Sequence, residues 1–64
     1  MDEMKAKLDR LLAEAEDCDL IGKLATDPEK RAYFAKLAGQ LRAMADDIKA
    51  VLAARTFGGS KNGG

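Results

Sequence analysis

The single proline, Pro28, is the residue that most constrains how this chain can fold. Pro28 has no backbone N–H and disfavours helical angles at Asp27, so a helix that reaches this point must end. The same residues also suit the start of a new helix. Asp27 can accept from free N–H groups as an N-cap, Pro28 fits the first helical position, and Glu29 complements the helix dipole. The sequence therefore predicts one helix before this dipeptide and another after it.

Apolar and small residues before the proline recur at alternating intervals of four and three, which is the spacing of a heptad seam. The row consists of Met4, Leu8, Leu11, Ala15, Cys18, Gly22 and Ala25. Leu12 and Ile21 lie beside this row and widen it, and charged residues fill other positions. The pattern predicts one amphipathic helix over residues 3–25.

A second heptad row follows the proline and consists of Phe34, Leu37, Leu41, Met44, Ile48 and Val51. A further row lies alongside it: Ala38, Ala45 and Leu52. The apolar face of this helix is wider than one neighbouring helix would cover, so we expect a second contact surface. The pattern predicts a helix over residues 28–56. The glycine-rich residues 58–64 are predicted to be a disordered tail.

The connection between the two predicted helices is a turn at residues 26–27, which is too short for anything except an antiparallel arrangement. Residues whose numbers add to between 53 and 59 should then be neighbours, for example Cys18 with Leu37 and Leu11 with Met44. The predicted fold is all-α: residues 1–57 form an antiparallel two-helix hairpin.

A hairpin of this size is not expected to be stable alone. A chain of 64 residues has a marginal core, and two helices that touch along one seam leave much of each apolar stripe in water. Two hairpins packed as a four-helix bundle would cover these stripes. We therefore predict a homodimer or a tight complex with a protein partner. The expected interface residues are Leu8, Leu11, Leu12, Phe34, Leu37, Leu41, Met44, Ile48 and Leu52.

The charges exclude some partners and favour the hairpin. The net charge is zero, so the chain has no long-range attraction for nucleic acid or an anionic membrane. Residues 1–25 carry seven acidic and four basic residues, whereas residues 29–64 carry three and seven, which favours the two halves lying side by side. No apolar run is long enough to span a membrane, and the first residues lack the pattern of a signal peptide. We expect a soluble, cytoplasmic protein.

No set of side chains in the sequence is sufficient for catalysis. There is no histidine to serve as a base beside Cys18, which lies in the seam and is expected to be a buried apolar residue. The thiol has no intrachain partner, and an intersubunit disulfide is kept as a secondary alternative. The acidic side chains of Glu14 and Asp17 fall on one flank of the helix and those of Glu16 and Asp19 on the other. The four carboxylates therefore cannot bind one metal ion together. We expect no enzyme activity, no cofactor, no metal site and no small-molecule substrate.

The leading interpretation is therefore a noncatalytic helical assembly or adaptor protein that acts through protein–protein contacts. The alternative is a small RNA- or DNA-binding regulator of the hairpin-dimer type. Its candidate contacts are Arg31, Arg42 and Lys49, which lie close to one line on the second helix. Asp46 lies within one turn of Arg42 and of Lys49, which favours a solvated, ion-paired face over a phosphate-binding one.

A set of features between Cys18 and Ala45 resembles the pattern of short bacterial proteins of unassigned function, many of them alphaproteobacterial. The matching features are Cys18, Leu24-Ala25, Asp27-Pro28-Glu29, Arg31, Phe34, Leu37-Ala38 and Met44-Ala45. They cover just under half of the chain. The chain departs from the pattern at Leu41, where a large aromatic residue is expected. The resemblance implies a helical hairpin and no activity.

A second likeness concerns architecture alone. The plasmid RNA-binding protein Rop is a similarly short hairpin that dimerises into a four-helix bundle. Its RNA-binding face lies on its first helices and uses basic, amide and aromatic side chains, whereas residues 3–25 of this chain contain no aromatic residue, Asn or Gln. No functional residue is carried over from this likeness.

Overall fold

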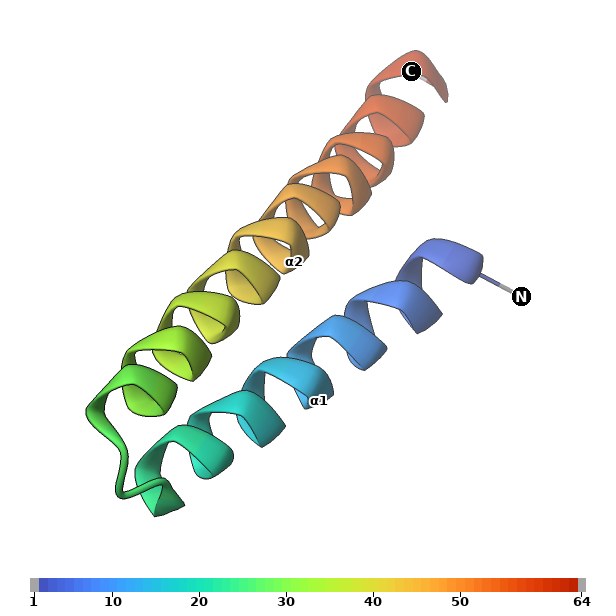
Figure 1. Cartoon of the computed structure of the whole chain (residues 1–64). Helices are drawn as coiled ribbons and strands as arrows, with labels where there is room; N and C mark the ends of the chain where they lie inside the picture. Colours follow the sequence, from blue (N-terminus) through green and yellow to red (C-terminus); the bar gives the residue numbers. More distant parts are fainter. Residues whose placement is uncertain (1, 64) are drawn as a thin grey trace.

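The chain folds into two helices that lie side by side and are joined by a tight bend (Figure 1). The computed structural model describes residues 2–63, with side chains described for residues 2–55. Helix α1 spans Glu3–Leu24 and helix α2 spans Pro28–Gly63. The described part contains no strand. The predicted all-α hairpin is thus confirmed.

The bend is built by the capping chemistry that the sequence predicts. α1 ends at Leu24, because Ala25 turns to extended backbone angles while its N–H still donates to the carbonyl oxygen of Ile21 over 3.0 Å. Asp27 then starts α2: its Oδ1 accepts from the N–H of Glu29 at 3.1 Å, and its carbonyl oxygen accepts from the N–H of Arg31 at 3.0 Å. Asp27 is therefore the N-cap, as predicted.

The start of α1 has a cap of the same kind, which was not among the predicted features. Oδ1 of Asp2 accepts from the N–H groups of Met4, at 3.1 Å, and Lys5, at 3.4 Å. A short carboxylate directly before the first helical residue satisfies two of the N–H groups that have no partner within the helix. The signal was present in the sequence as an Asp followed by an apolar heptad row.

Helix α2 continues through Gly63 and so extends past the end predicted at residue 56. None of the glycines in the described part has a positive φ, so the left-handed conformation that commonly ends a helix at glycine is not used at residues 58 or 59. The side chains from residue 56 onward lie outside the described part, and so does residue 64. The predicted disorder of residues 58–64 stays a prediction.

The two helices are antiparallel and in the predicted register. A Cβ atom placed on Gly22 would lie 3.4 Å from Cβ of Phe34 and 3.7 Å from the carbonyl oxygen of Arg31. The numbers 22 and 34 add to 56, inside the predicted range. Two pairs of buried residues give the same sum: Leu11 with Ala45, and Cys18 with Ala38. At the other end of α1, Nη1 of Arg55 lies 3.3 Å from Sδ of Met4.

The innermost row of α2 differs from the one expected. Among the α2 side chains that the structure describes, Ala38 and Ala45 are buried, whereas Phe34, Leu37 and Leu41 are only half-buried. On α1 the buried residues are likewise mostly small: Leu11, Ala15, Cys18 and Gly22. Small side chains let two helix backbones approach closely, and the larger side chains of the expected row then lie along the edges of the contact. The core of the hairpin is therefore thin.

No helix in the described part of the chain is both long enough and apolar enough to cross a membrane.

Candidate protein contact surface

The two long sides of the hairpin, where α1 and α2 meet, differ in chemistry. We call one the apolar face and define it by Ile21, Leu24, Tyr33, Leu37, Leu41, Met44 and Val51. We call the other the charged face and define it by Asp19, Lys23, Arg31, Arg42, Asp46 and Lys49. The two faces flank the same buried seam, so a molecule that binds one face does not cover the other.

Two hollows place residues of both helices on the apolar face. Near the bend, a hollow of about 640 Å³ is lined by Ile21 and Leu24 of α1 and by Tyr33 and Phe34 of α2. Farther along, a hollow of about 360 Å³ has lining residues from both helices: Glu14, Asp17, Cys18, Leu37 and Leu41. Met44 and Val51 follow Leu37 at seven-residue intervals, so they extend the same side of α2.

Large apolar side chains on this face remain in contact with water. Tyr33 is 61% exposed, Met44 48% and Val51 43% on α2. Near the bend, Leu24 is 73% exposed and Ile21 46%. The rings of Tyr33 and Phe34 pack edge to face, with centroids 5.2 Å apart, which fixes an aromatic pair at the bend end of the face. The exposed stripe extends along the length of the helix contact.

The charged face contains an ion pair that joins the two helices. Arg42 of α2 donates to Oδ2 of Asp19 on α1, and both side chains remain partly exposed. The hydrogen bond from Arg42 lowers the pKa of Asp19, and the positive charge of Lys23 acts in the same direction. The hydrogen bond to Asp19 in turn raises the pKa of Arg42. The pair thus favours the charged form of both groups.

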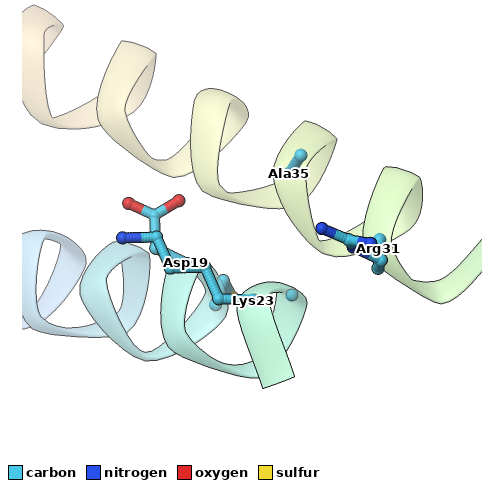
Figure 2. Close-up of a pocket in the computed structure, with 6 residues that line it drawn as sticks. Asp19, Lys23, Arg31 and Ala35 are labelled. Atoms are coloured by element: carbon cyan, nitrogen blue, oxygen red, sulfur yellow. The ribbon is translucent and has the colours of Figure 1, made fainter. Parts of the chain in front are cut away.

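The charged face also carries a small hollow, of about 250 Å³, between the helices. Figure 2 shows Asp19 and Lys23 reaching it from α1 and Arg31 and Ala35 from α2. Lys49 approaches Asp46 on the same helix at 3.9 Å, which confirms an ion-paired stretch around Asp46. Arg42 pairs with Asp19 of α1 and not with Asp46.

The predicted interface residues are distributed over several environments. Leu11 is 2% exposed and packs inside the hairpin, so it has almost no surface left to contact a partner chain. Met44 is the most exposed of the set. Leu12 precedes Asp19 by seven residues and therefore lies toward the charged face. The remaining members of the set are half-buried: Leu8, Phe34, Leu37, Leu41, Ile48 and Leu52.

Four residues of the apolar face were not among the predicted interface residues: Ile21, Leu24, Tyr33 and Val51. Val51 is the last member of the second heptad row, and the other three lie beside a row or just outside it. Because the small residues take the centre of the helix contact, these edge positions become the exposed apolar surface. These residues could have been identified from the sequence, because large apolar residues stand beside rows that contain Ala and Gly, and the small residues favour the centre of a helix contact.

The acidic and thiol groups are placed as the helix geometry predicts. Glu14 and Asp17 line the hollow on the apolar face, whereas Asp19 points to the charged face. Within the described residues, no group of three or more His, Cys, Asp or Glu side chains is arranged to hold a metal ion. Cys18 is a free, buried cysteine in the helix contact.

Comparison of the chain with protein-family models, curated proteins and solved structures finds no match.

Proposed function

We propose that this chain is a noncatalytic helical assembly or adaptor protein, and that it forms a homodimer in which two hairpins pack as a four-helix bundle. The observation that carries the proposal is the exposed apolar face. Tyr33, Met44 and Val51 follow one side of α2, and each is more than 40% exposed in the isolated hairpin. A contiguous apolar surface with charged residues at its edge is typical of a protein contact.

The thin core of the hairpin supports the same proposal. Among the described side chains, the core contains one large residue, Leu11, together with Ala15, Cys18, Ala38 and Ala45. Such a seam removes little apolar area from water, and the free energy of folding depends mainly on that area. Burial of the apolar face against another helical surface would supply the missing area. Folding and assembly would then be coupled.

The alternative, an RNA- or DNA-binding regulator, has weaker support in the geometry. Of its three candidate contacts, Arg42 is paired with Asp19 and Lys49 lies near Asp46. A phosphate would have to compete with these carboxylates. Arg31 remains exposed at the hollow of the charged face. A mobility-shift assay with mixed RNA and DNA at low salt tests this alternative, because phosphate binding should produce a shift that disappears as salt is added.

Sedimentation equilibrium from about 1 to 100 μM tests the proposed assembly, since this range spans the dissociation constants expected for a small helical dimer. Circular dichroism on the same samples measures the helix content. We expect the mass of a dimer, and a helix content that falls on dilution together with the mass. A monomer that keeps its full helix content over the whole range would refute the proposal. We further propose that the protein acts in the cytoplasm, where a single free cysteine stays reduced.

A further inference from the structure

We propose that the occupant of the apolar face is the same face of a second copy, docked in one defined register. In this arrangement α2 lies antiparallel to the partner's α2, the two helices cross at Met44, and the two bends lie at opposite ends of the bundle. The inference rests on the proposed homodimer. It specifies which face the two copies share, how the two-fold axis relates them, and which residues lie opposite each other.

The first step is the symmetry of the stripe on α2. Leu37, Met44 and Val51 are evenly spaced by seven residues, so the stripe is symmetric about Met44. In a two-fold antiparallel pair centred there, positions whose numbers add to 88 face each other. Leu37 then packs against the partner's Val51, and the two copies of Met44 meet on the axis. The contacts between these three positions are all apolar.

The second step concerns α1, whose position is fixed by the hairpin itself. Neighbouring residues of α1 and α2 have numbers that add to 56, as Gly22 and Phe34 do. A two-fold axis that passes Met44 therefore passes α1 at position 12, and positions that add to 24 face each other across the dimer. Glu14 and Asp17 line the hollow on the apolar face, and Lys7 and Arg10 precede them by seven residues on the same sides.

These four charges are complementary in that register. Lys7 faces the partner's Asp17, and Arg10 faces the partner's Glu14. The two-fold axis repeats both pairs, so four pairs of opposite charge lie along the middle of the α1 edge of the interface. Pairs at such an edge contribute little to affinity, but like charges in the same places would be unfavourable, so the charges act mainly on the choice of register.

The same charges disfavour the registers that the apolar stripe alone would permit. A slide of one heptad in one direction keeps Leu37 against the partner's Met44 but brings Glu14 opposite the partner's Asp17. A slide in the other direction keeps Met44 against the partner's Val51 but brings Lys7 opposite the partner's Arg10. Only the register centred on Met44 satisfies the apolar stripe and the charges together.

The other two-fold arrangement, with both bends at the same end, is disfavoured by burial. It would place α1 of one copy on α2 of the other. Lys7 would then lie close to the other copy's Val51, and Glu14 close to its Met44, and burial of a charge without a partner is costly. Pairing α2 with α2 and α1 with α1 keeps apolar residues together and charges together.

The first test substitutes Met44→Asp and compares it with Ala43→Asp. Ala43 is exposed on the outer side of α2, so the control adds the same carboxylate to the same helix without entering the proposed interface. We expect Met44→Asp to raise the dimer dissociation constant on the order of 100-fold, because two carboxylates would meet on the axis. Ala43→Asp should leave the dimer intact. Dimers that survive Met44→Asp would overturn this face while leaving the homodimer itself standing.

The second test exchanges charges between subunits and does not touch the apolar stripe. Lys7→Glu gives a chain that is acidic at both positions 7 and 17, and Asp17→Lys gives a chain that is basic at both. Each should form a weaker homodimer than the unmodified chain. An equimolar mixture should form the heterodimer, which native mass spectrometry distinguishes by mass. A statistical mixture of homodimers and heterodimer, with unchanged affinities, would overturn the register.

The two tests separate the possible failures. If the unmodified chain is a monomer, the proposed homodimer fails and this inference fails with it. If the chain is a dimer that responds to neither Met44→Asp nor the charge exchange, the homodimer stands and the assigned face is wrong. If it responds to Met44→Asp alone, the face stands and the register is wrong.

Discussion

Arg42 of α2 binds Asp19 of α1 across the helix contact, so one ion pair connects the two arms of the hairpin on its charged face. Elsewhere in the described part, the helices meet mainly through small apolar side chains, which carry no directional preference, and Arg55 contacts Met4 near the start of α1. The pair therefore contributes to fixing how the helices lie along each other. It also gives the stability of the hairpin a defined dependence on pH.

We predict that acid weakens this connection. The hydrogen bond from Arg42 lowers the pKa of Asp19 in the folded chain. In the unfolded chain this pKa is about 4, so the charged carboxylate stabilises the fold fully at pH values above about 4. That contribution is lost as the pH falls through the lower pKa of the folded state. The thermal midpoint of the unmodified chain should exceed that of Asp19→Asn at pH 7, and the difference should shrink below about pH 4. Thermal melts from pH 7 to pH 2 measure it.

The control for this prediction is the Arg42→Ala variant. Without the guanidinium, Asp19→Asn should have little further effect on the midpoint at pH 7, because the two residues act as a pair. An equal effect of Asp19→Asn with and without Arg42 would contradict the assigned pairing.

The close approach of the helices at Gly22 predicts different outcomes for two glycine substitutions. Gly39 has no atom within 4 Å of an added Cβ, so Gly39→Ala should stabilise the hairpin by about 0.5 to 1 kcal/mol through helix propensity. At Gly22 the added Cβ would contact Phe34 at 3.4 Å, so Gly22→Ala should gain less. Gly22→Leu should destabilise the fold by about 1 to 3 kcal/mol by overpacking. Urea unfolding gives all three values, and a stabilising Gly22→Leu would contradict the contact.

The cap at the bend predicts the effect of a single carboxylate. Removal of the Asp27 side chain in Asp27→Ala takes away the acceptor for the N–H of Glu29 and should cost about 1 kcal/mol in unfolding free energy. Asp27→Asn keeps an acceptor oxygen and should cost less. The comparison by urea unfolding separates the cap from general effects of sequence change at the bend. Equal losses for both variants would show that the cap geometry is not responsible.

The burial of Cys18 predicts slow reaction of its thiol. The side chain lies in the helix contact and is 9% exposed, so a thiol reagent should modify it only when the hairpin opens. The rate measured with a chromogenic disulfide reagent should therefore be low in buffer and should rise sharply in urea. Rapid modification of the folded protein would place the thiol on an accessible surface and would revive the intersubunit disulfide as an alternative.

Local backbone chemistry explains why the bend and the register were predictable. Pro28 cannot continue a helix and Asp27 can start one, so the end of the first helix, the short turn and the start of the second follow from these two residues. A turn of that length leaves one antiparallel arrangement, and the sum of residue numbers follows from it. These features depend on neighbours in sequence, which a sequence displays directly.

The centre of the contact could not be chosen from the heptad pattern alone. Two adjacent rows of α2 are both apolar, and the heptad spacing predicts that the row of large residues forms the centre of the contact with α1. The structure places Ala38 and Ala45 at the centre, because close backbone approach favours small residues there. The cross-helix pairing of Arg42 was missed for a similar reason, since Asp46 is near in sequence and Asp19 is near only after folding.

The central claim is that the apolar faces of two copies meet at Met44, and intermolecular nuclear Overhauser effects test it most directly. A dimer is formed from equal amounts of isotope-labelled and unlabelled chain, and an isotope-filtered spectrum then detects only contacts between subunits. We predict contacts between the Leu37 methyls of one chain and the Val51 methyls of the other, together with contacts between the two Met44 methyls. Intermolecular contacts confined to the charged face, or none at all, would contradict the claim.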